Sequence, residues 1–165
     1  MFLRLDDGEA NISPITHSQE RLTNITEFDI VIVSDYNKGF LDEEWLKYLG
    51  RFANLSILDS KRKLTKDVVD SFTFVKLNEK EYCNNHEVQG CTNIITTLGE
   101  KGARFDGVVY ESPKPQETID VSGAGDTFTA SFIVAYYKTK DIEESIIYAN
   151  NKSAIVVSKR GVATP

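Results

Sequence analysis

The chain has 165 residues, of which 41% are hydrophobic and 27% charged, and its formal net charge is -6. This size and composition are typical of one globular domain, so we expect a single domain over residues 1–165. The acidic balance argues against a general binder of nucleic acid or of anionic membranes, because such proteins need a basic face. No apolar run reaches the roughly 18 residues of a transmembrane helix, so no membrane partner is expected either.

The two cysteines, Cys83 and Cys91, lack the spacing of a zinc site or of a redox motif. Free thiols indicate a reducing compartment, and the cytoplasm is the expected location. Residues 2–6 resemble a strand that begins without a turn or cap, which suggests that something precedes it. Residues 16–25 are mostly polar and predict a short surface helix.

The middle of the chain alternates between strand and helix patterns. The apolar, β-branched run Phe28–Ser34 predicts a strand buried on both faces. Asp42 then begins a helix to about Phe52, with Trp45, Leu46, Leu49 and Phe52 as its buried stripe. Further strands are predicted at residues 55–59, 73–77 and 93–98, with a short helix at residues 79–84.

The last third carries a hairpin pattern and two helix patterns. Residues 103–110 predict a hairpin with its turn at Asp106-Gly107. A long apolar helix pattern ends near Lys138. Asp141 has the spacing of an N-cap with a capping box, and its helix runs to about residue 159, with Gly161 as C-terminal cap.

This alternation predicts an α/β fold with a mostly parallel sheet. Ligands of such sheets bind at the carboxyl ends of the strands. Polar residues follow each predicted strand, so we expect them to gather along one rim and to form a phosphate or nucleotide site. The clusters are Asp35/Lys38, Asp59/Lys61, Asn78/Glu81, Thr97/Gly99 and Gly123/Asp126.

The stretch from Asp120 to Thr127 places two glycines and small residues between two aspartates, directly before a helix. Glycine lets the backbone approach a ligand closely, and a helix N-terminus favours an anion. Asp126 at this point could act as a general base beside a bound phosphate. The alternative is an ordinary strand-to-helix turn in which an aspartate complements the helix dipole.

The stretch Asp120–Phe128 resembles the C-terminal signature of the ribokinase-like (PfkB) carbohydrate kinases. The neighbouring motifs occur in the order seen in the heptose 7-phosphate kinase branch, the kinase domain of bifunctional enzymes that make ADP-heptose for lipopolysaccharide. The resemblance covers essentially the whole chain and implies a ribokinase-like three-layer sandwich. The motifs are Leu3–Asp6, Ser34–Gly39, Asp59–Lys61, Asn78–Glu81 and Tyr148–Asn150.

The resemblance implies a role for each matching residue of the signature. Asp126 resembles the catalytic base that takes the proton from the attacking sugar hydroxyl. The backbone N–H groups of Gly123, Ala124 and Gly125 resemble the anion hole for the transferring phosphoryl group. This agrees with what the glycines and the helix start indicate by themselves.

The motif Asn78-Glu79-Lys80-Glu81 resembles the Asn-x-x-Glu motif that lies near the ATP phosphates and Mg²⁺. Glu81 is implied as a metal ligand through water, since Mg²⁺ takes oxygen ligands and keeps several waters. From the residues alone, a helix N-cap with its first-turn acid explains Asn78 and Glu81 equally well.

Other matches imply the rest of the nucleotide site. Thr97, Gly99 and Gly102 resemble the loop that lines the nucleotide, and Asn150 and Gly161 are implied near the adenine. A helical asparagine and a capping glycine also have ordinary structural explanations.

Asp35 and Lys38 are implied at the phosphate end of the site, as candidates on the substrate side, while a solvated loop is the alternative. ATP and Mg²⁺ are the implied cofactors. The implied substrate is a small sugar phosphate, attacked through O1 in the heptose branch.

The family domain is longer than this chain, and the part before Met1 would hold the first βα units, the sugar-binding motifs and most of the lid. The expected fold is therefore truncated at its N-terminus, and a homo-oligomer or a complementing polypeptide is an expected partner. Two other functions stay open: a nucleotide-binding remnant without sugar kinase activity, and a kinase of this fold for another sugar.

Overall fold

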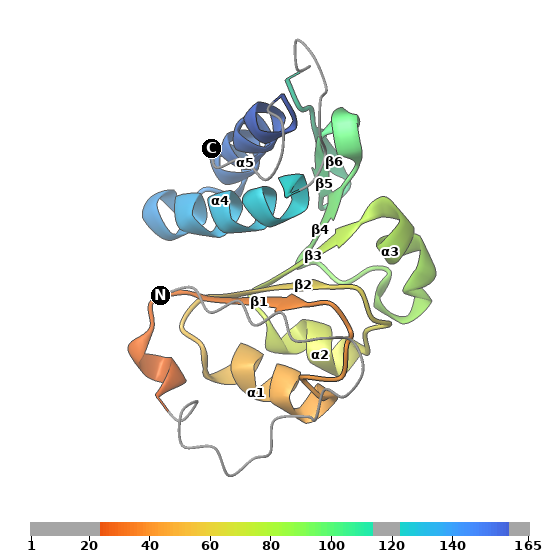
Figure 1. Cartoon of the computed structure of the whole chain (residues 1–165), viewed down its shortest axis with the longest axis vertical. Coiled ribbons are helices and arrows are strands. Elements are labelled where there is room, and N and C mark those ends of the chain that lie inside the picture. The colour runs from red at the N-terminus through yellow and green to blue at the C-terminus, as the bar shows by residue number, and fades with distance from the viewer. Residues whose placement is uncertain (1–23, 114–122, 159–165) are drawn as a thin grey trace.

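A computed structural model describes residues 24–113 and 123–158 of the chain (Figure 1). The predicted strand at residues 2–6, most of the predicted helix at residues 16–25, and Gly161 lie outside the described residues. A short 3-10 helix, η2 (Ile25–Glu27), opens the described part. No helix of the described residues is both long and apolar enough to cross a bilayer.

The described residues form one six-stranded sheet with strand order β1-β2-β3-β4-β5-β6. The first four strands pair in parallel and the last two are antiparallel, which confirms the predicted α/β fold with a mostly parallel sheet. Parallel neighbours bring their carboxyl ends to one edge. The strands are β1 (Val31–Asp35), β2 (Ser56–Ser60), β3 (Phe74–Asn78), β4 (Ile94–Thr97), β5 (Ala103–Phe105) and β6 (Val108–Tyr110).

Helices cover both faces of this sheet, which gives three layers (Figure 1). On one face lie α1 (Glu43–Phe52) and α2 (Lys66–Ser71), and on the other lie α4 (Ala124–Thr139) and α5 (Ile142–Val157). Short helices lie between the later strands: α3 (Glu79–Asn84) and η3 (His86–Val88) between β3 and β4, and η4 (Gly99–Lys101) between β4 and β5.

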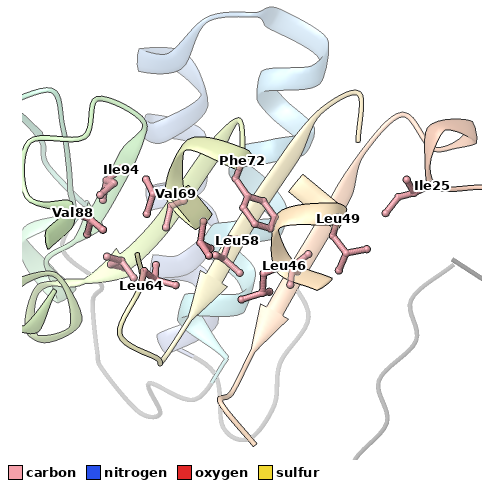
Figure 2. Close-up of a cluster of buried hydrophobic side chains, with 13 residues drawn as sticks. Ile25, Leu46, Leu49, Leu58, Leu64, Val69, Phe72, Val88 and Ile94 are labelled. Atoms are coloured by element: carbon pink, nitrogen blue, oxygen red, sulfur yellow. The ribbon is translucent and has the colours of Figure 1, made fainter. Parts of the chain in front are cut away.

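Two apolar clusters hold the layers together, one on each face of the sheet. The first joins the sheet to α1 and α2 and includes Leu46, Leu58 and Phe72 (Figure 2). The second joins the sheet to α4 and α5 and includes Ile57 and Phe132. Successive residues of β2 therefore face opposite helical layers, as the two-residue period of a strand requires.

Several local predictions are confirmed. The short helix at residues 79–84 forms as predicted. The hairpin turn lies at Asp106-Gly107, where φ is 46° and 77°, the left-handed values of a tight two-residue turn. Asp141 caps α5 by accepting a hydrogen bond from Glu144 N at 2.9 Å. Both cysteines of the chain, Cys83 and Cys91, are free, and burial raises the pKa of the Cys91 thiol.

Two predictions were wrong in detail, and one helix was missed. Phe52 is the last residue of α1, beyond the covered stripe, so its side chain is 52% exposed and contacts the ring of Tyr48. The helix α5 ends at Val157 with Ser158 as its cap, before the predicted end near residue 159 and without Gly161. The helix α2 was not predicted, because its six residues offer only Val68 and Val69 as a buried stripe.

Candidate functional site

A cleft lies where the carboxyl ends of β1, β2 and β3 face the first turn of α4. Its volume of about 150 Å³ is below the roughly 300–1,000 Å³ of a pocket that encloses a drug-sized ligand. It gathers eight of the residues predicted for this rim: Asp35, Asp59, Lys61, Asn78, Glu81, Gly123, Gly125 and Asp126. Three further residues complete the lining: Ser34, Tyr36 and Lys76.

The first turn of α4 supplies the most direct anion-binding feature of the cleft. Gly123 is its N-cap with φ of 79°, a left-handed conformation that glycine adopts without strain. The first helical hydrogen bond runs from Thr127 N to Gly123 O at 2.9 Å. Helix geometry therefore offers no carbonyl within the helix to the N–H groups of Ala124, Gly125 and Asp126, and N–H groups in this position can bind an anion.

Asp126 lies in that first turn with an exposed side chain. Among the described residues, the Tyr36 hydroxyl reaches its carboxylate across the cleft and lies 3.5 Å from Oδ2, at the long limit of a hydrogen bond. The ring of Tyr36 is in turn covered by Lys61, whose Nζ lies 4.2 Å from the ring centroid. A carboxylate in this position can accept a proton from a group that enters the cleft.

Lys76 is a cleft residue that the sequence reasoning missed. It lies on β3 with an exposed fraction of 6%, and its Nζ donates to Asp59 Oδ2 at 2.9 Å. A Cβ atom built on Gly125 would lie only 3.2 Å from Lys76 Nζ, so the ammonium group stands directly beside the first turn of α4. The sequence signal that could have identified Lys76 is a single lysine inside an otherwise apolar strand.

Asp35 has very different surroundings from Asp126. Its buried carboxylate accepts hydrogen bonds from Arg62 Nε and Nη2, from Ser60 Oγ at 2.8 Å and from Asn37 N at 3.0 Å. Arg62 Nη2 also donates to Leu41 O at 2.7 Å. These bonds tie the loop after β1 to the loop after β2. A contact of Asp35 with substrate stays a prediction.

Asn78 and Glu81 form a reciprocal capping box at the start of α3. Glu81 N donates to Asn78 Oδ1 at 2.8 Å, and Asn78 N donates to Glu81 Oε2 at 2.7 Å. Both also line the cleft, whereas Glu79, Lys80 and Lys38 are exposed residues outside its lining. Within residues 24–113 and 123–158, no group of three or more His, Cys, Asp or Glu side chains could hold a metal by itself.

The other residues predicted around the nucleotide lie outside the cleft lining, namely Thr97, Gly99, Gly102 and Asn150. Two of them have structural explanations. A Cβ on Gly102 would lie 2.0 Å from Tyr110 O, so only glycine fits there. Asn150 Nδ2 donates to Tyr110 O at 2.9 Å and to Glu111 O at 3.4 Å, which holds α5 to the end of β6.

The model of the pfkB family of carbohydrate kinases matches residues 16–165. The bifunctional protein HldE of Nitratiruptor sp. is 30% identical over 173 residues, which cover 89% of this chain and 37% of that protein. HldE of Helicobacter pylori (strain J99) is 32% identical over 163 residues, covering 84% of this chain and 35% of that protein.

Solved structures show the same fold. Ribokinase of Arabidopsis thaliana, complexed with ribose and ATP, matches with a TM-score of 0.71 and 20% identity, covering 88% of this chain and 55% of that chain. Adenosine kinase of Schistosoma mansoni matches with a TM-score of 0.72 and 17% identity, covering 90% and 56%. The chain thus spans about half of these kinases and between a third and two-fifths of the two HldE proteins.

Proposed function

The chain belongs to the pfkB family of carbohydrate kinases, and we propose that it serves the transfer of the γ-phosphoryl group of ATP to a hydroxyl of a sugar phosphate. One observation carries the proposal: Asp126 lines the cleft from the first turn of α4, and the N–H groups of such a turn can bind an anion. The basic Lys76 stands beside that turn. A proton acceptor, helix N–H groups and a cation are the parts that phosphoryl transfer requires.

The roles follow from these positions. The acceptor hydroxyl gives its proton to the Asp126 carboxylate as its oxygen attacks the γ-phosphorus. The bond from the γ-phosphorus to the β–γ bridging oxygen breaks, and ADP leaves with that oxygen. The N–H groups of Ala124 and Gly125, together with the Lys76 ammonium, stabilise the charge on the phosphoryl oxygens.

The cleft residues fit ATP with Mg²⁺. Glu81, Asn78 and Asp59 supply oxygen atoms to its lining, and Mg²⁺ prefers oxygen ligands, largely through water. Glu81 would hold the ion in this way, and the ion would neutralise charge on the phosphates. The cleft has room for the phosphoryl end of ATP, so the contacts of the nucleoside with Thr97, Gly99, Asn150 and other residues stay predictions.

We propose a heptose 7-phosphate as the acceptor. Support comes from the motif order and from the 30% and 32% identity to the two HldE proteins. The ribokinase and the adenosine kinase matched in structure favour a pentose or a nucleoside as the alternative acceptor. The cytoplasm, where ATP is made, is the proposed location.

A second candidate function is nucleotide binding without sugar phosphorylation, by a homo-oligomer or together with a complementing polypeptide. The observation that favours it is the cleft itself, which joins the first turn of α4 to the Lys76 ammonium and so suits an anion.

The test measures ADP release from Mg·ATP in a coupled assay with heptose 7-phosphate, fructose 6-phosphate, ribose and adenosine. We expect release that depends on the acceptor and is fastest with heptose 7-phosphate. Faster release with another acceptor would reassign the substrate. Calorimetry with ATP and with each acceptor completes the test, because ATP binding without acceptor binding or turnover supports the second candidate.

A further inference from the structure

We infer that Asp59 is a positioning residue of the phosphoryl site: its ion pair holds the Lys76 ammonium beside Gly125, and a bound anion competes with Asp59 for that ammonium. The inference rests on one part of the proposed function, namely that the first turn of α4 binds a phosphoryl anion.

The sheet itself places the two residues together. Asp59 of β2 and Lys76 of β3 are register partners on neighbouring parallel strands. Side chains alternate along each strand, and Ile57 and Phe74, two residues earlier, belong to the apolar cluster under α4 and α5. Asp59 and Lys76 therefore both face α4 and stand at the end of the sheet where the cleft opens.

Burial makes the pair interdependent. The side chains of Lys76 and Asp59 are 8% and 13% exposed, and Nζ lies 2.9 Å from Oδ2. A buried charge left without its partner is strongly unfavourable, so each side chain determines where the other can stand. Lys76 without Asp59 would have freedom to move toward an anion or toward solvent.

Thr129 ties this pair to the helix. Its Oγ1 lies 3.1 Å from Asp59 Oδ2 and 3.0 Å from Gly125 O. A hydroxyl has one proton, so it donates to one of these oxygens at a time. Asp59 Oδ2 thus joins β2 to β3 through Lys76 and to the second turn of α4 through Thr129.

The pair stands where the anion would bind. Lys76 Nζ would be 3.2 Å from a Cβ on Gly125, which leaves the ammonium against the backbone that offers the helix N–H groups. The Asp59 carboxylate balances the charge of the Lys76 ammonium. Asp59→Asn would leave the ammonium to pair with the anion and should strengthen anion binding, whereas removing the ammonium should weaken it.

Two other roles of Asp59 would give different experimental results. A purely structural ion pair would change stability and leave anion affinity unchanged. A carboxylate that contacts Mg²⁺ would act in the presence of metal, with or without Lys76. Anion binding measured without metal separates both from positioning.

The experiment is a double-mutant cycle on the binding of tripolyphosphate in EDTA, by calorimetry at fixed salt. The chains are the wild type, Asp59→Asn, Lys76→Met and the double variant, with thermal unfolding as a check on folding. We expect about threefold tighter binding for Asp59→Asn and about tenfold weaker binding for Lys76→Met. The double variant should bind within about twofold of Lys76→Met, because Asp59 acts through Lys76.

Asp70→Asn is the matched control. It removes one carboxylate from an ion pair with Lys66 on the opposite helical layer, and tripolyphosphate affinity should not change. If Lys76→Met does not fold, Lys76→Gln replaces it in the same cycle.

Unchanged or weaker binding for Asp59→Asn would overturn the inference. An equal effect of Asp59→Asn on tripolyphosphate affinity with and without Lys76 would also overturn it. The same holds if the wild type binds no tripolyphosphate. Failure of the kinase proposal would give a different result. No acceptor would support ADP release, while the expected pattern of tripolyphosphate affinities would still be measured.

Discussion

Asp35 and Asp126 line the same cleft, yet their surroundings are opposite. Asp35 is 6% exposed and accepts hydrogen bonds from Arg62, Ser60 and Asn37. Asp126 is exposed, and among the described residues its carboxylate is approached by the Tyr36 hydroxyl at 3.5 Å. A carboxylate surrounded by donors holds the backbone in place, while one with open oxygens can accept a proton.

The largest expected effect is on catalysis. Asp126→Asn should lower the rate of phosphoryl transfer by about 10³-fold, because the amide cannot take the proton of the acceptor hydroxyl. ATP affinity and thermal stability should stay near those of the wild type. Steady-state kinetics measures the rate, and calorimetry measures the ATP affinity and the thermal stability. Substantial remaining turnover would show that Asp126 is not the base.

Arg62→Met tests the structural role of Asp35, the other carboxylate of the comparison. It leaves the Asp35 carboxylate buried without its main cation, and such losses destabilise by about 3–5 kcal/mol. Urea unfolding followed by circular dichroism measures the change in the free energy of unfolding. A loss equal to that of Asp70→Asn, at the exposed pair on α2, would mean that the Asp35 bonds do not hold the fold.

Gly123→Ala should have an intermediate effect. The residue has φ of 79°, and an L side chain in the left-handed region costs roughly 1–2 kcal/mol. The cost should appear as a lower free energy of unfolding and as weaker tripolyphosphate binding. Gly125→Ala is the contrast, since Gly125 is helical and its new Cβ would press on the movable Lys76 end at 3.2 Å. We expect Gly125→Ala to alter anion affinity with little loss of stability.

Tyr36→Phe should have the smallest effect. A contact of 3.5 Å is a weak hydrogen bond, so the rate should fall by about threefold at most. Tyr36→Ala also removes the ring that Lys61 covers and serves as the comparison. A rate loss for Tyr36→Phe as large as that for Asp126→Asn would show that the hydroxyl takes part in the proton transfer.

The local pattern of residues was sufficient to predict most elements of the described fold. Apolar runs gave the parallel strands, Asp106-Gly107 gave the hairpin turn, and Asp42 and Asp141 gave two helix starts. These features depend on neighbours in sequence. Phe52 and the end of α5 were mistaken because the extent of each covered surface depends on distant elements.

The sequence by itself determined the α/β class, the family motifs and the candidate base Asp126. Only the tertiary structure decided which polar residues meet. It placed Lys76 and Asp59 beside Gly125, surrounded Asp35 with donors, and left Thr97, Gly102 and Asn150 outside the cleft. The physical reason is that strand register and helix packing set these distances, and both arise from contacts between residues far apart in the chain.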